Sequence, residues 1–127
     1  MEYKDLQELV AGYLQHYRTK DARYDAAVSR ITAMTFLSGP EEQWAMILEA
    51  LRQAGNDEEL AHIAAGPIEG FLGKHGKDYI ERVERQASSN PTFARTLTGV
   101  WKYMMPDDVW ARIQVLQSRV TNPLARS

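Results

Sequence analysis

Apolar residues recur at intervals of three and four positions along almost the whole chain. This spacing places them on one face of an α-helix, and no segment between turn signals alternates between apolar and polar residues as a half-buried strand does. The first stripe illustrates the pattern with Tyr3, Leu6, Val10, Tyr13 and Tyr17. The hydrophobic pattern therefore predicts an all-α protein.

Turn and capping residues divide the pattern into about seven or eight short helices. Near residue 39, Gly39-Pro40 suits the end of one helix and the first turn of the next, and Ser38 with Glu41 has the spacing of a capping box. Asn56 and Asn90 are expected to be the N-caps of two further helices.

Two dipeptides, Gly66-Pro67 and His75-Gly76, predict further breaks in the helical path. The helices are expected to form one compact domain over residues 1–120, followed by a frayed tail over residues 121–127.

A shift of 33 residues superimposes two central segments. It aligns residues 44–72 with residues 77–105 and places six identical residues opposite one another. The match either reflects shared helical composition or marks two successive helical hairpins, stacked as in HEAT-like arrays.

Composition narrows the classes of function. The chain of 127 residues contains no cysteine, which excludes disulfides, thiolate metal sites and cysteine nucleophiles. Its net charge of −2 provides no positive field for nucleic acid, and no apolar stretch is long enough to span a membrane. The first residues are charged and no signal-peptide apolar segment follows them, so we expect a cytoplasmic protein.

The charge is unevenly distributed. Residues 41–69 contain seven acidic residues and one basic residue, a net charge of −6, whereas residues 70–127 have a net charge of +4. Part of this acidic block falls in first helical turns, where carboxylates interact favourably with the helix dipole. Alternatively, the block forms a negative surface, including Glu58, Glu59 and Glu69, that steers a basic partner.

Candidate catalytic and metal-binding groups are sparse. No serine lies in a Gly-x-Ser-x-Gly turn, and the clustered glycines lack the Lys-Ser/Thr ending of a phosphate-binding loop. Glu59 and His62 have the spacing Glu-x-x-His, but a di-iron bundle needs two such motifs. His62, Glu69 and His75 could surround a ligand or a metal, whereas surface Glu–His pairing is the simpler interpretation. We therefore expect no cofactor.

Aromatic residues and methionines cluster between Val100 and Trp110. Trp101 and Trp110 continue helical stripes and are expected in the core, whereas Tyr103 and Met105 lie off the stripe and are expected at the surface. Aromatic residues and methionine are enriched in interfaces, so Tyr103 and Met105 are candidates for partner binding or for a homodimer contact.

Three central segments stand out together, Trp44-Ala-Met-Ile-Leu-Glu-Ala-Leu, Ile63-Ala-Ala-Gly-Pro-Ile-Glu69 and Gly99-Val-Trp101. With them, residues 40–105 resemble an uncharacterised bacterial family of small helical domains of unknown function, marked by an Ala-Gly-Pro-Ile/Leu-Glu segment. The resemblance implies a helical fold and a bacterial, cytoplasmic origin, and it implies no specific activity. In that family an acidic residue usually follows the glutamate, whereas this chain has Gly70, so a paired-carboxylate site is not implied.

These observations predict a non-catalytic helical module that binds another protein. An immunity-type protein that neutralises a basic toxin would account for the acidic block. The alternative is a small-molecule or metal-dependent enzyme with a site near Gly66-Pro67, using His62, Glu69 and His75. The alternative requires these three side chains to converge on one concave pocket.

Overall fold

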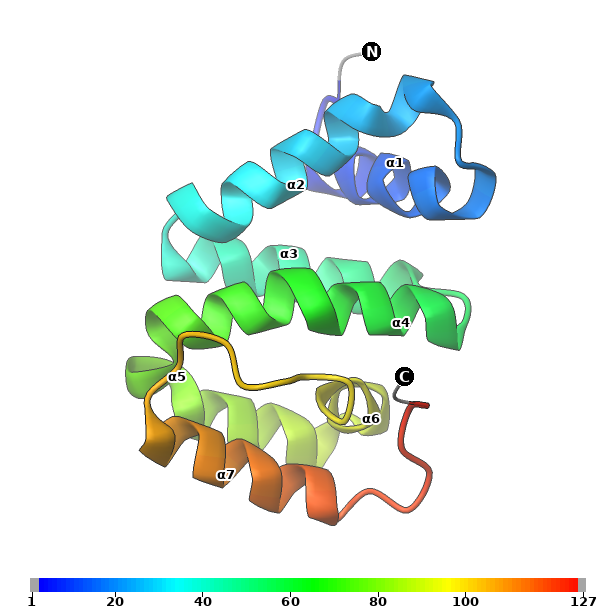
Figure 1. Ribbon diagram of the computed structural model, residues 1–127. Coiled ribbons are helices and arrows are strands. Elements are labelled where there is room, and N and C mark those ends of the chain that lie inside the picture. Colours follow the sequence, from blue (N-terminus) through cyan, green and yellow to red (C-terminus); the bar gives the residue numbers. More distant parts are fainter. Residues whose placement is uncertain (1–2, 126–127) are drawn as a thin grey trace.

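The N-terminal part of the chain forms a helical hairpin, the upper layer in Figure 1. The computed structural model describes residues 3–125, in which α1 (Leu6–Thr19) is followed by the 3₁₀ turn η1 (Ala22–Tyr24) and by α2 (Asp25–Leu37). The predicted stripe of α1 faces the core, where the buried residues are Leu9, Val10, Tyr13 and Leu14.

The middle layer consists of α3 (Pro40–Gln53) and α4 (Asp57–Ile63). α4 continues without interruption into the π-helical turn η2 (Ala64–Ile68) and α5 (Glu69–Ser89). The helical path turns near the α5 label in Figure 1, where α5 leaves the middle layer and enters the lower one.

Neither predicted break ends a helix. Pro67 has no N–H group, and in a regular α-helix its ring would collide with the carbonyl group four residues earlier. The π-helical turn widens the helix here, and the Glu69 amide bonds to the Ala64 carbonyl, five residues back. At His75-Gly76 the helix also continues, although the path bends within this glycine-rich part of α5.

Side-chain caps begin two of the helices as predicted. The Oδ1 atoms of Asn56 and Asn90 each accept a hydrogen bond from the amide three residues later, at 2.9 and 3.1 Å. The capping box predicted for Ser38 and Glu41 does not form, because Gly39 is the N-cap of α3.

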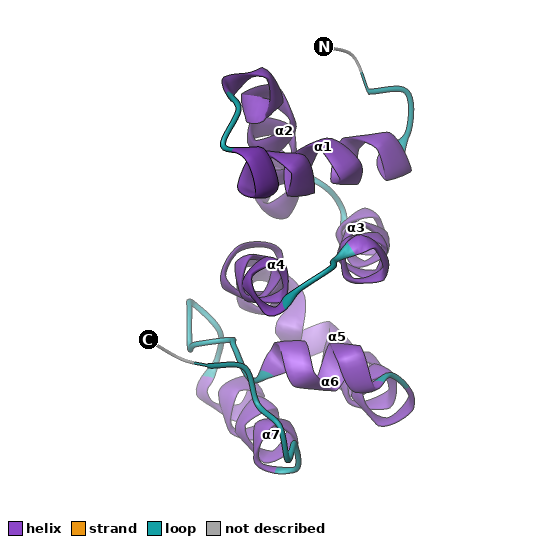
Figure 2. Cartoon of the chain, turned by 90° about the vertical axis from the view of Figure 1, so that its right-hand side faces the viewer, coloured by secondary structure: helices purple, strands orange, loops and turns teal. Residues whose placement is uncertain are grey.

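The lower layer contains the end of α5 together with α6 (Pro91–Leu97) and α7 (Asp107–Ser118). Figure 2 shows these helices below α3 and α4. Trp44 of α3 contacts Phe71 and Phe93, with ring centroids 5.6 and 5.7 Å apart, and so joins the middle layer to α5 and α6. The described residues contain no strand, and the all-α prediction is confirmed.

The connections between helices also bear on the predictions. α3 and α4 form one helical hairpin, α5 and α6 form the next, and the two hairpins are in contact with one another. The 33-residue repeat in the sequence stays a prediction. None of the helices within residues 3–125 combines the length and apolar character needed to cross a bilayer.

The C-terminal segment packs on the lower layer. Leu124 is only 3% exposed, and its amide donates a hydrogen bond to Thr98 Oγ1 at 2.8 Å. The predicted frayed tail is therefore wrong for residues 121–125, and residues 126–127 lie outside the described part of the chain.

Candidate functional site

A pocket of about 470 Å³ lies where α1 and α2 face η2 and the beginning of α5. Its volume falls in the range of ligand-binding sites. We call it the π-turn pocket, because Ala65, Gly66 and Pro67 of η2 line it. Its aromatic and ionisable lining residues are Tyr13, Tyr17, Phe36, His62, Glu69 and Tyr103.

Gly66 and Gly70 determine the shape of the part of the pocket that η2 and the beginning of α5 form. A Cβ atom at Gly66 would meet no atom within 4 Å, so this residue borders open space. A Cβ atom at Gly70 would overlap Cγ2 of Thr35, a buried residue of α2. The missing side chain at Gly70 therefore lets α2 approach α5 and brings Phe36 to the pocket.

Stacked rings from α1 and α4 form another part of the lining. Tyr17 and His62 stack with centroids 3.8 Å apart and an interplanar angle of 23°, and Tyr13 meets Tyr17 edge-on at 5.2 Å. Burial lowers the pKa of His62, so its imidazole is largely neutral at pH 7. Burial raises the pKa of Tyr13, which keeps its phenol neutral. The His62 imidazole thus adds little positive charge to the pocket at pH 7.

Glu69 connects the pocket to the loop over residues 98–106. Its side chain is largely buried, and Oε2 accepts a hydrogen bond from the Trp101 amide at 3.3 Å. Gly73, one turn later, allows the loop to lie close to α5, since a Cβ atom there would be 2.9 Å from the Tyr103 carbonyl oxygen. The loop is therefore held beside the pocket.

Met104 adopts an unusual backbone conformation in this loop. Its φ is 55°, in the left-handed region that residues with a Cβ atom rarely occupy. The side chain is nevertheless 79% exposed, so little burial offsets the strain. The loop thus presents a methionine to solvent from a strained backbone.

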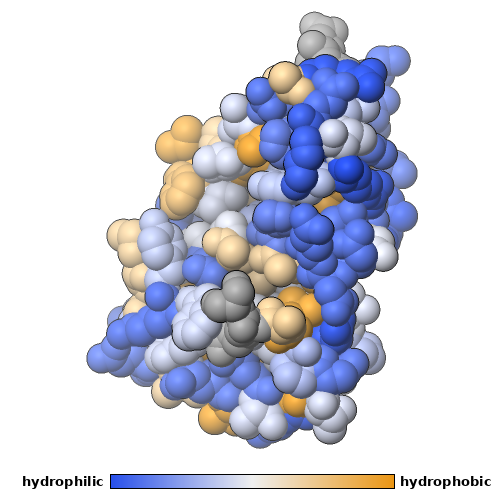
Figure 3. Space-filling model, turned by 45° about the vertical axis from the view of Figure 1, so that its right-hand side comes forward, coloured by the Kyte–Doolittle hydropathy of each residue, from blue (hydrophilic) through white to orange (hydrophobic). Residues whose placement is uncertain are grey.

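Exposed apolar side chains gather around the pocket. Phe36 and Leu37, at the end of α2, are 49% and 82% exposed, and Trp101 and Tyr103 are 54% and 42% exposed. Phe36, Tyr103 and Met104 also line a second cavity of about 310 Å³, which we call the side pocket. We call the exposed residues around these cavities the apolar rim, which consists of Phe36, Leu37, Trp101, Tyr103 and Met104. In Figure 3, hydrophobic atoms gather toward the left-hand edge, whereas much of the right-hand part is hydrophilic.

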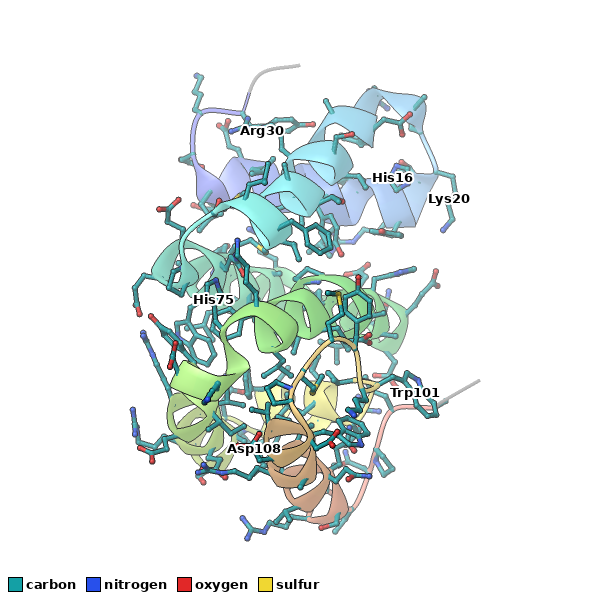
Figure 4. The ribbon with its side chains drawn as sticks, turned by 60° about the vertical axis from the view of Figure 1, so that its left-hand side comes forward. His16, Lys20, Arg30, His75, Trp101 and Asp108 are labelled. Carbon is teal, nitrogen blue, oxygen red and sulfur yellow. The ribbon has the colours of Figure 1, made fainter. Side chains whose placement is uncertain are left out.

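The structure brings His62 and Glu69 to the π-turn pocket but places His75 elsewhere. His75 follows Glu69 by six positions, which is a rotation of about 240° around a helix, so His75 contacts Phe71 and Tyr79 instead. In Figure 4, His75 lies on the opposite side of the view from Trp101. Within residues 3–125, no three His, Asp or Glu side chains are grouped to hold a metal ion. The predicted three-residue ligand site therefore does not form.

His75 is nevertheless chemically distinct. Burial lowers its pKa, and its Nε2 atom is enclosed without a hydrogen-bond partner among the described residues. Its neighbours are aromatic rings, so the neutral imidazole packs as part of the core edge.

Arginines compensate much of the acidic block. The pairs are Arg18–Glu59 (2.7 Å), Arg52–Glu49 (2.5 Å), Arg82–Glu41 (2.6 Å) and Arg95–Asp57 (2.6 Å). In each pair, hydrogen bonding to arginine lowers the pKa of the carboxyl group. Arg52 is already counted in the net charge of the block, but Arg18, Arg82 and Arg95 come from outside residues 41–69, so the block is a less negative surface than its sequence indicates.

Three of the residues predicted to bind a partner are not exposed at the surface. Glu59 is 2%, Met105 4% and Glu69 9% exposed, so their predicted place on an exposed surface is wrong, although Glu69 lines the π-turn pocket. Glu58 is exposed, and its Oε1 atom lies 3.8 Å from both Lys20 Nζ and His62 Nε2.

The errors near Met105 share a cause. The prediction extended the apolar face of one helix through Trp101, but α6 ends at Leu97. Trp101 therefore lies in a loop, and it is exposed instead of buried. Tyr103 is exposed as predicted. Phe36 and Leu37 were missed, although both fall off the stripe of α2 immediately before a turn.

Comparison with known proteins assigns the chain to a family. Residues 15–121 match a family of unknown function, DUF6869, and this span contains every lining residue of the π-turn pocket except Tyr13. No curated protein and no solved structure matches the chain. By its match over most of its length, the chain belongs to DUF6869, a family of unknown function.

Proposed function

We propose that this protein is a non-catalytic interaction module that docks another protein on the apolar rim. The observation that carries the proposal is the meeting of exposed apolar side chains from two distant segments, residues 36–37 and 101–104, beside a pocket. Contiguous apolar surface bordered by polar residues is typical of binding sites. Phe, Trp, Tyr and Met are also the side chains enriched at interfaces.

The conformation of Met104 supports this proposal. An exposed side chain on a backbone with φ of 55° contributes little to the stability of the fold. Strained residues that persist without such a contribution are concentrated at functional sites. Docking of a partner would bury Met104 and thereby offset the strain.

The rim, more than the acidic block, is expected to recognise the partner. Four arginines compensate carboxylates of the block, which weakens its long-range attraction for a basic protein. Neutralisation of a basic toxin, as by an immunity protein, is one form of this proposal. We place the interaction in the cytoplasm, a compartment compatible with a chain that lacks cysteine.

A small-molecule or enzymatic function is the second candidate. It is favoured by His62 and Glu69, which line one pocket at the Gly66-Pro67 position. A neutral imidazole is suited to act as a general base. Binding of a small ligand inside the pocket would not depend on Met104, which lines only the side pocket.

Affinity capture with a matched control tests the proposed function. Wild-type protein, Met104→Glu and Val115→Glu are immobilised and exposed to lysate of the native host. Val115 is 50% exposed on α7 and lies outside the rim, so its substitution controls for added charge. We expect a protein that wild type and Val115→Glu retain and that Met104→Glu retains at least about tenfold less.

Equal retention by all three baits would contradict docking on the rim. Sedimentation of the purified protein provides the second measurement. A dimer that dissociates on Met104→Glu substitution would mean that the rim binds a second copy of the chain.

A further inference from the structure

The lining of the π-turn pocket combines aromatic rings with a carboxylate. Tyr13, Tyr17, Phe36 and Tyr103 supply four rings, and Glu69 supplies a hydrogen-bonded carboxylate. The lining residues include no lysine and no arginine. Aromatic faces attract ammonium and guanidinium groups, most strongly where water is partly excluded.

Cationic side chains close to the pocket already have partners. Lys20 Nζ lies 3.8 Å from Glu58 Oε1 and 5.8 Å from the centroid of the Tyr17 ring. Lys74 Nζ donates a hydrogen bond to the Phe36 carbonyl oxygen at 2.6 Å. Figure 4 shows Lys20 at the outer end of the upper layer. The lining of the pocket is therefore rich in aromatic rings and contains no lysine or arginine, and its one histidine, His62, has a lowered pKa.

We propose that the π-turn pocket receives a lysine or arginine side chain from the partner protein. This inference rests on the proposed function, and it specifies the chemistry of the partner. The ammonium or guanidinium group would contact the rings of Phe36 and Tyr103, because Tyr17 is already stacked on His62 and Lys20 Nζ lies over the same ring. Its N–H groups would donate to tyrosine hydroxyl and Glu69 carboxylate oxygens.

The side pocket extends the recognition to a second residue of the partner. The two cavities share Phe36, Gly70 and Tyr103, so one extended segment can reach both. The side pocket presents mainly apolar groups, among them Met104. A segment with a basic residue close to an apolar one fits this pair of cavities.

Nuclear magnetic resonance titration with defined probes tests the inference. The probes are the methylamides of Nα-acetyl-lysine, Nα-acetyl-arginine and Nα-acetyl-norleucine. The first two keep a charged side chain, and norleucine is an uncharged analogue of lysine. The backbone amides of Gly66 and Gly70 report on the pocket, because both residues line it. We expect both charged probes to shift these signals, and norleucine to bind at least about fivefold more weakly.

Substitution of Tyr103 provides the matched comparison. Tyr103→Leu removes a partly exposed ring, whereas Tyr24→Leu removes a ring outside the pocket. Only Tyr103→Leu should weaken binding of the charged probes. Equal affinity for lysine and norleucine probes, or equal binding by Tyr103→Leu and wild type, would overturn the inference.

Competition separates this inference from the proposed function. The lysine probe, at a concentration that saturates the pocket, should release the protein captured by wild type, whereas the norleucine probe should not. A captured protein that is lost on Met104→Glu substitution but is not released by the lysine probe would support docking on the rim and refute insertion of a basic side chain.

Discussion

Gly66 and Gly70 are about one helical turn apart, yet an added methyl group should have opposite effects at the two positions. No glycine in the described chain has a positive φ, and a Cβ atom at Gly66 would meet open space. Gly66→Ala should therefore raise the free energy of unfolding by about 0.4–1 kcal/mol, because it restricts the unfolded chain. Gly70→Ala should lower it by about 1–3 kcal/mol, because the methyl group overlaps Thr35. Urea denaturation measures both changes.

Thr35→Ser supplies the control for this steric explanation. Serine keeps the hydroxyl that donates to the Ile31 carbonyl oxygen at 2.9 Å, but it lacks the Cγ2 atom that a methyl group at Gly70 would overlap. The Gly70→Ala, Thr35→Ser double variant should recover most of the lost stability. If Gly70→Ala alone were as stable as wild type, close packing of α2 on α5 would be refuted.

At the scale of elements, the pair of Arg18 and Glu59 joins the end of α1 to the beginning of α4. Arg18 donates two hydrogen bonds to the Glu59 carboxylate, at 2.7 and 2.8 Å, and Glu59 also accepts the Gly55 amide at 2.8 Å. Glu59→Gln should lower the free energy of unfolding by about 2–4 kcal/mol, because it weakens a buried charge-assisted network. Arg52→Gln, in the exposed pair with Glu49, should cost less than about 1 kcal/mol.

The same pair gives stability a defined dependence on acid pH. Hydrogen bonding to Arg18 holds the pKa of Glu59 below its ordinary value of 4.5. The stabilising contribution is therefore complete above pH 4.5 and is lost as pH falls through the lowered pKa of the folded state. Denaturant titrations at neutral and acid pH should show wild type losing more stability than Glu59→Gln. Parallel losses in the two proteins would assign the acid sensitivity to other carboxylates.

Capping residues made some elements predictable, and the proline at residue 67 made one prediction fail. Asn56 and Asn90 act through atoms within three residues, so their caps could be identified from the sequence. Pro67 indicates the end of a regular α-helix, whereas a π-helical turn removes the collision and lets the helix continue. The end of α6 at Leu97 is marked by no capping or turn residue that we recognised in the sequence. The predictions of a buried Trp101 and an exposed Met105 were therefore both wrong.

At the scale of the whole molecule, the C-terminal segment is part of the packed structure. Arg95 Nε donates to the Asn122 carbonyl oxygen at 2.7 Å, and Leu124 is buried. Leu124→Ala should lower the free energy of unfolding by about 2–4 kcal/mol through loss of buried contacts. Val115→Ala removes an exposed side chain and should change stability by no more than about 0.5 kcal/mol. Equal stability of the two variants in thermal and urea unfolding would contradict docking of the tail.

Contacts between distant segments set the limit on what could be predicted from the sequence. The acidic block is compensated by arginines such as Arg82 and Arg95, which follow their partners by 41 and 38 positions. The apolar rim likewise combines Phe36 with Tyr103, which no periodicity connects. The alternative interpretation of the sequence put a site near Gly66-Pro67, and two of its three candidate residues, His62 and Glu69, line the pocket because they flank the same turn.

The π-helical turn also has a consequence for changes in chain length. Each residue advances an α-helix by about 100°, and η2 accommodates its extra residue within one widened turn. Deletion of Pro67, whose ring requires the widened turn, would allow regular α-helix to form and would keep the register of α5 relative to α4, because the turn already absorbs the one extra residue. Ile68 and Phe71 would then still face the core. The same deletion in the regular part of α5 would instead rotate the residues after it by about 100° and turn buried side chains such as Val83 away from the core.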